Sequence, residues 1–142
     1  MKFILIGVIL FMFNCAGTRP TNLGLTNGTL IPCPESPNCV NSQIDKSDSH
    51  FIEPIKYTKD LKSAIGDLKT VISKMPKTNL VVEKESYLYF EFTSKLMGYV
   101  DDVEFYFDDL NKTIHVRSAS RLGKSDLGVN RKRIESIRSE LK

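Results

Sequence analysis

The sequence carries little net charge for its 142 residues. Lysine and arginine total 20 against 17 aspartates and glutamates, which gives a formal charge of +3. Removal of a leader containing Lys2 would leave 19 against 17, or +2. Nucleic-acid-binding domains usually gather basic residues on one face. We therefore expect no nucleic-acid partner and at most a weak attraction to anionic lipid.

Motifs for metal or cofactor chemistry are also missing. The sequence contains no recognisable Ser-His-Asp arrangement, glycine-rich phosphate loop or cluster of metal ligands. Only His50 and His115 could assist Cys33 and Cys39, and they lack the close spacing of zinc ligands. The sequence therefore predicts no metal and no cofactor.

No apolar run is long enough to remain in a membrane. The longest, from Phe3 to Phe13, is interrupted only by Gly7 and follows the positive Lys2. As a helix these 11 residues would span about 16 Å, roughly half of the ~30 Å hydrocarbon core. This length favours a cleavable signal peptide over residues 1–14.

Cys15 follows the apolar run and is the predicted lipidation site. The flanking residues Met12 to Gly17 resemble a bacterial lipobox, in which the cysteine is acylated, for example with palmitate, and becomes the new N-terminus. Met12, Phe13 and Asn14 depart from the usual leucine and small residues of that pattern. Cleavage after Gly17 would instead release a soluble secreted or periplasmic protein. The odd number of cysteines favours lipidation, so we expect an exported protein anchored to a bacterial membrane.

Cys33 and Cys39 lie six residues apart in a turn-rich loop. In the oxidising space outside the cytoplasm this spacing favours a structural disulfide. Closing so short a loop would stabilise the fold by about 2 kcal/mol. A metal site or a redox dithiol is the alternative, although the spacing is not Cys-x-x-Cys.

The mature chain divides into a short tether and one domain. Residues 15–29 consist mainly of Gly, Thr, Asn and Pro with isolated leucines, which is typical of a flexible tether. Residues 30–142 are long enough for a single domain. We expect the domain to begin at Leu30.

Hydrophobic periodicity predicts an α+β domain. Apolar residues recur at three- and four-residue steps over about 59–75 and 127–141, which predicts two helices; Thr58 would be the N-cap of the first. Four strands are expected: a short valine-rich one over 80–83, and three over 87–93, 100–108 and 113–118, where apolar and polar side chains alternate. The order α-β-β-β-β-α predicts an antiparallel sheet of about four strands, covered on one face by two helices.

The polar face of this sheet is the candidate site. We expect a polar cleft between the sheet and the last helix, in which Arg117, Arg121 and Arg131 hold an anionic group. Asp101, Asp102 and Glu104 would orient these arginines. The full set of candidate binding residues is Asp101, Asp102, Glu104, Arg117, Ser118, Ser120, Arg121, Ser125, Asp126, Asn130 and Arg131.

Three other interpretations of these residues remain open. Asp102 and Glu104 stand one strand step apart, about 6–7 Å, and could divide acid and base roles in a hydrolase-like enzyme. The charges could instead form a structural salt-bridge lattice, with Asp126 or Ser125 capping the last helix. The face could also dock another envelope protein.

Four segments in order resemble one known family. They are Leu30–Ser42, His50–Pro54, Gly98–Phe105 and the run from Arg117 to Glu135. Together they are similar to the domain-of-unknown-function family 1499, found in bacterial envelope proteins and in plants. The resemblance implies a small, often exported or lipid-anchored domain without an assigned activity. It also implies that Asp-Asp-x-Glu and Arg-Ser-Ala-Ser-Arg are family signatures.

Overall fold

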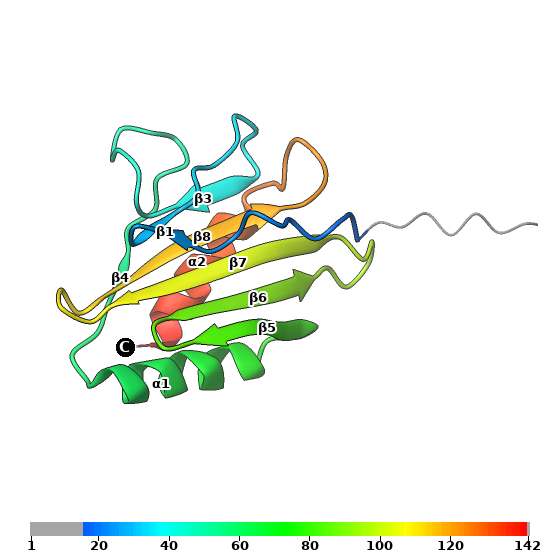
Figure 1. The fold of residues 1–142 in the computed structure, drawn as a ribbon. Coiled ribbons are helices and arrows are strands. Elements are labelled where there is room, and N and C mark those ends of the chain that lie inside the picture. Colours follow the sequence, from blue (N-terminus) through cyan, green and yellow to red (C-terminus); the bar gives the residue numbers. More distant parts are fainter. Residues whose placement is uncertain (1–15, 142) are drawn as a thin grey trace, which may run out of the picture.

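The computed structural model describes residues 16–141 as two helices around one main antiparallel sheet (Figure 1). The strands of this sheet are β3 (Cys39–Asn41), β4 (Ile55–Lys56), β5 (Thr78–Lys84), β6 (Tyr87–Thr93), β7 (Val100–Asp108) and β8 (Thr113–Ser120). They lie in the order β3-β8-β7-β6-β5, and β4 also pairs with β8. A separate hairpin joins β1 (Leu25–Thr26) to β2 (Thr29–Leu30). The helices are α1 (Leu61–Ser73) and α2 (Val129–Glu140).

Both helices pack on the same face of the sheet and form the main core with it. Alternate residues of β6, β7 and β8 point to this face because strand side chains alternate. They meet the apolar side of each helix, including Leu68 of α1 and Ile134 of α2, which are fully buried. The predicted α+β class and the single helix-covered face are therefore confirmed.

Differences from the predicted elements lie at short strands and helix ends. The sheet has six strands rather than about four, because β3 and β4 are only three and two residues long and show no periodicity. Thr58 is not the N-cap of α1. Asp60 caps it instead, since its carboxylate accepts from the backbone N–H of Ser63 at 2.9 Å.

The opposite face of the sheet is covered by the N-terminal segment, defined here as residues 16–31. In Figure 1 this blue segment runs across the near side of the sheet, while α2 lies behind it. Leu30 is 2% exposed and packs with Tyr87 and Tyr89, and Leu23 and Leu25 pack against the same cluster. The structure thus differs from the predicted flexible tether, because these isolated leucines pack against tyrosines of the sheet.

A two-residue turn organises this segment. Asn27 and Gly28 connect β1 to β2 with φ values of 52° and 76°. Positive φ at both positions is what a type I′ hairpin turn requires, and Asn-Gly is its commonest sequence. The hairpin is therefore encoded locally, although the segment's composition indicates a loop.

The predicted signal peptide, residues 1–14, and the predicted lipidation site Cys15 lie outside the described residues. Within residues 16–141, no helix is both long and apolar enough to cross a membrane.

Candidate functional site

Arg121 is the centre of an ionic cluster on the face covered by the N-terminal segment. Its Nε and Nη2 atoms donate to both carboxylate oxygens of Asp102 at 2.6–3.1 Å. Nη2 also reaches the carboxylate of Glu91 and, at 3.0 Å, the hydroxyl of Tyr89. The Tyr89 hydroxyl in turn donates to Asp102. Each polar group around this arginine thus has a charged or hydroxyl partner.

Glu104 forms a second buried pair on the same face. Its side chain is fully buried, and Oε2 accepts from Arg117 Nη1 at 3.3 Å. Oε1 accepts from the Tyr87 hydroxyl and from the backbone N–H of Gly24, both at 2.8 Å. Arg117 Nε is the only buried side-chain nitrogen or oxygen without a hydrogen-bond partner in residues 16–141. The cation is thus bound on one edge of its guanidinium only.

The N-terminal segment is attached to the sheet through these two groups of charges. Arg19 donates to Glu91 at 2.7 Å, and the Gly24 N–H is held by Glu104. We call the whole set the outer lattice: Arg19, Tyr87, Tyr89, Glu91, Asp102, Glu104, Arg117 and Arg121. It contains three arginines and three carboxylates, so its formal charges cancel.

Proton affinities in the outer lattice follow from burial and pairing. The hydrogen bond from Arg19, together with Arg121, lowers the pKa of Glu91 to about 2. Burial and the neighbouring carboxylates raise the pKa values of Tyr87 and Tyr89 far above their usual range. Burial lowers the pKa of Arg117, which Glu104 partly offsets. At neutral pH Glu91 is therefore ionised and the tyrosines are neutral donors.

A second polar cluster, the inner cluster, lies on the opposite face between the sheet and α2. Asp101 accepts from Arg133 at 2.5 Å, and the Arg133 guanidinium lies 4.8 Å from the centre of the Phe92 ring. Arg133 also donates to Ser118 at 3.0 Å and to Asn130 at 2.8 Å. These bonds fasten α2 to β7 and β8.

Asn130 links the inner cluster to the start of α2. Its Nδ2 donates to Asp126 at 2.8 Å, to Ser120 at 3.0 Å and to the Asn38 carbonyl at 3.1 Å. The carboxylate of Asp126 also accepts from the backbone N–H groups of Gly128 and Asn130. Burial opposes ionisation of Asp126, but these hydrogen bonds keep its pKa below the ordinary value. Asp126 therefore stabilises the first turn of α2.

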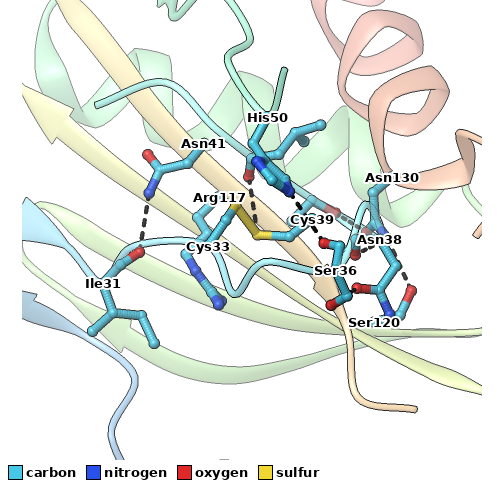
Figure 2. The surroundings of a disulfide bond; sticks show 12 residues. Ile31, Cys33, Ser36, Asn38, Cys39, Asn41, His50, Arg117, Ser120 and Asn130 are labelled. Carbon is cyan, nitrogen blue, oxygen red and sulfur yellow. Dashed lines mark hydrogen bonds between the residues drawn. A yellow bond between two sulfur atoms is a disulfide. The ribbon is translucent and has the colours of Figure 1, made fainter. Parts of the chain in front are cut away.

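The predicted disulfide is present and lies beside residues of both the outer lattice and the inner cluster, Arg117 and Asn130 (Figure 2). Cys33 and Cys39 are bonded with a Cα–Cα distance of 5.7 Å (Figure 2). His50 contacts the Ser36 carbonyl at 3.1 Å on one side of the loop. Asn38 donates to the Gly123 carbonyl at 2.8 Å on the other. The loop is therefore fixed at several points.

The structure does not bring the eleven candidate residues into one cleft. Arg117 and Arg121 lie under the N-terminal segment, whereas Arg131 is on α2, across the sheet. Arg131 donates to the carbonyls of Phe51 and Ser49 at 2.8 and 2.9 Å. Asp101 holds Arg133 and none of the three predicted arginines. Ser125 is exposed and accepts only a long bond from the Leu127 N–H.

A small cavity of about 150 Å³ is what remains at the position of the predicted cleft. It lies between the disulfide loop and the start of α2, and is lined by Pro37, Cys39, Val40, Ser49, Ser125, Asp126, Gly128 and Arg131. Its one cation is Arg131, already bonded to two carbonyls. Asp102 and Glu104 are 2% and 0% exposed, so a substrate in this cavity would not reach the proposed acid and base pair.

Several residues of these clusters were missed in the sequence. Arg133 stands three residues after Asn130, so helical spacing could have placed both beside Ser118. Tyr87, Tyr89 and Glu91 alternate with buried apolar residues, which identifies their face. Nothing in the sequence indicates that Arg19 reaches Glu91, 72 residues away. Among residues 16–141, no group of three or more His, Cys, Asp or Glu residues could hold a metal ion.

Comparison with known proteins places the chain in a family without assigning it an activity. No curated protein and no solved structure matches it. The family model described as "Protein of unknown function (DUF1499)" matches residues 29–141. That range contains the disulfide loop, both helices and the whole main sheet. The resemblance seen in the sequence is thus confirmed, and the chain belongs to the DUF1499 family.

Proposed function

We propose that this protein is an exported, lipid-anchored component of the bacterial cell envelope, attached through acylated Cys15. It acts there as a non-catalytic binding or assembly module. The outer lattice and the inner cluster serve mainly to hold this module in one shape, and its exposed surface makes the contacts with partners.

The observation that supports this proposal is the close packing of the residues that follow Cys15. A Cβ atom placed on Gly17 would lie 3.1 Å from Cγ of Leu122, so this backbone already touches the domain. Arg19 and Gly24 are then bonded to Glu91 and Glu104. A lipid on Cys15 would therefore hold the folded body directly at the membrane.

A small anionic ligand at the arginines receives less support than a structural lattice. Arg121 is paired with two carboxylates and Arg117 with a third, so an anion there would have to displace a buried partner. Removing one member of such a pair is costly because the other charge stays buried. We propose that these arginines bind the protein's own carboxylates.

Intact mass spectrometry of the full chain, purified from the bacterial envelope, tests the anchor. We expect a mass that lacks residues 1–14 and includes acyl chains, because acylation at Cys15 precedes cleavage. Reduction should add the mass of two hydrogen atoms as the disulfide opens. Cys15→Ser should lose the acyl mass and keep residues 1–14, because cleavage depends on prior acylation. A wild-type mass that corresponds to an unacylated chain beginning at Thr18 contradicts the proposal.

Arg121→Ala distinguishes the structural lattice from an anion site. We expect a lower melting temperature and no change in the binding of inorganic phosphate, because the lost partners are Asp102, Glu91 and Tyr89. Arg131→Ala is the matched control, since Arg131 contacts only carbonyls. Loss of phosphate binding with an unchanged melting temperature would favour the ligand site instead.

A further inference from the structure

The N-terminal segment begins at one end of the sheet, which we call the exit end. The β6–β7 loop, residues 94–99, and the β8–α2 segment, residues 121–128, emerge there together, because Asp101 pairs with Ser120 and the Arg121 N–H bonds to the Val100 carbonyl at 3.1 Å. Gly17 packs against Leu122 at the same place. Figure 1 shows the dark-blue start of the described chain beside these two loops.

Exposed apolar side chains gather at the exit end. In residues 16–141, seven large hydrophobic residues are exposed, and six of them lie there: Leu96, Met97, Tyr99, Leu122, Leu127 and Val129. Leu96 and Leu127 are 93% and 86% exposed. Leu127 also adopts a φ of 53°, which a leucine rarely takes. Grouped exposed apolar residues commonly mark a contact surface.

Lysines accompany these apolar side chains. Lys77, Lys95, Lys124 and Lys132 are exposed near the same two loops, and none of them has an ion-pair partner within residues 16–141. A groove of about 390 Å³ lies between the start of the β6–β7 loop and the start of α2, and its lining includes Lys95, Val129 and Lys132. The nearby Asp101 and Asp126 are occupied by Arg133 and Asn130.

The other end of the sheet is different. There the turns at 84–87 and 108–113 carry Glu85, Asp108 and Asp109 together with Lys84 and Lys112, and Leu110 is the one large exposed hydrophobic among residues 16–141 at this end. Two of these carboxylates are held locally, by Asn111 and by Lys112 with Tyr57. The group of six exposed apolar residues, with lysines that lack ion-pair partners beside it, therefore distinguishes the exit end.

We infer that the exit end is a membrane-contact surface that inserts its apolar side chains between the headgroups of an anionic bilayer. Unpaired lysines beside exposed apolar residues match what the headgroup region of such a bilayer attracts. The inference rests on the proposed anchor at Cys15, since the chain leaves the domain at this end. It adds an orientation: the sheet stands with the exit end on the membrane and the β7–β8 turn away from it.

Single-tryptophan variants test this orientation, because the chain contains no tryptophan. Leu96→Trp and Leu110→Trp are matched: both leucines are 93% exposed, lie in turns of the same sheet and occupy opposite ends. The full chain, acylated in a bacterium, would be reconstituted into phosphatidylethanolamine and phosphatidylglycerol vesicles with brominated acyl chains. We expect blue-shifted, quenched emission for Leu96→Trp, and unshifted, unquenched emission for Leu110→Trp.

Two further variants strengthen the test. Leu127→Trp should behave like Leu96→Trp. Because Leu127 lies in the β8–α2 segment, agreement between the two variants would show that the quenching is not a local property of the β6–β7 loop. Adding Lys124→Glu and Lys132→Glu to Leu96→Trp should reduce the quenching, because each lysine contributes attraction to an anionic surface.

Equal quenching of the Leu96→Trp and Leu110→Trp variants, or none in either, overturns the inference. If the same samples carry acyl chains by mass, the proposed anchor stands. A mass without acyl chains overturns the anchor and the inference together, and the mass spectrum distinguishes this case from the first.

Discussion

The centres of the two faces of the main sheet are buried to the same degree by opposite means. Toward the helices, Val103, Phe105 and Val116 have no exposed surface. Toward the N-terminal segment, Glu104 and Asp102 are 0% and 2% exposed, as deeply buried as the apolar core. One face excludes water through hydrophobic packing, and the other does so with charges that are paired.

This comparison shows that burial alone does not identify a site. A charge can be buried when partners replace its lost hydration. The outer lattice meets that condition with three arginines, three carboxylates, two tyrosine hydroxyls and one backbone N–H. The apolar side chains on the helix face need no hydrogen-bond or ion-pair partners, because apolar packing is non-directional.

The largest effect should come from a cavity on the helix face. Phe105→Ala removes a fully buried ring in contact with Phe90. We expect a loss of about 4 kcal/mol in the free energy of unfolding, since the core cannot refill that volume. Urea denaturation measures it, and the loss should not change with salt. A loss that varied strongly with salt would contradict the apolar description of this face.

A slightly smaller effect should follow a broken pair on the other face. Arg117→Met leaves the Glu104 carboxylate buried without a cation, which should cost about 3 kcal/mol. Adding Glu104→Gln removes the buried charge but keeps an acceptor for Tyr87 and Gly24, so the double variant should regain part of the stability. A double-mutant cycle by urea denaturation measures this coupling. Strictly additive losses would show that the pair is not coupled.

The disulfide should have an intermediate effect. Replacing Cys33 and Cys39 together by alanine should lower the free energy of unfolding by about 2 kcal/mol, because the short loop no longer restricts the unfolded chain. Reduction of the wild-type protein is the control and should give a similar loss in urea. A much smaller loss would mean that the bonds from His50 and Asn38 hold the loop without the disulfide.

The smallest effect should be the acid titration of Glu91. Its pKa is about 2 in the folded state against an ordinary value of 4.5, so its stabilising contribution is complete above about pH 5 and is lost progressively as the pH falls through 4.5 and then through 2. We expect about 1.5–2 kcal/mol, the lower end of the range for hydrogen bonds to a charged group. Thermal unfolding of wild type and Glu91→Gln between pH 2 and 7 measures it. The difference between the two should shrink to a small remainder at pH 2; a constant difference would contradict the assignment.

The sequence predicted the elements of the fold well where periodicity is long. Tyr87–Thr93 and Val100–Asp108 alternate over seven and nine residues, and both strands occur with those bounds. It failed for β3 and β4, because two or three residues carry no period. The hairpin turn at Asn27 and Gly28 was not predicted either, since the surrounding composition indicates a loop.

The candidate site was predicted less well than the fold. Alternation correctly indicated that Asp102, Glu104 and Arg117 share the polar face. It could not indicate the partners on this face, because Arg19 reaches Glu91 across 72 residues, Gly24 reaches Glu104 across 80 and Arg121 reaches Asp102 across 19. Composition even favoured a solvated segment where residues 16–31 instead cover the charges.

By itself, the sequence determined the α+β class, the disulfide and the family, because local periodicity, cysteine spacing and ordered motifs carry that information. Only the tertiary structure decided that the polar face is a buried lattice and that Arg131 lies apart from Arg117 and Arg121. The physical reason is that the energy of a buried charge depends on partners brought from distant parts of the chain. Those partners become neighbours only when the sheet, α2 and the N-terminal segment pack together.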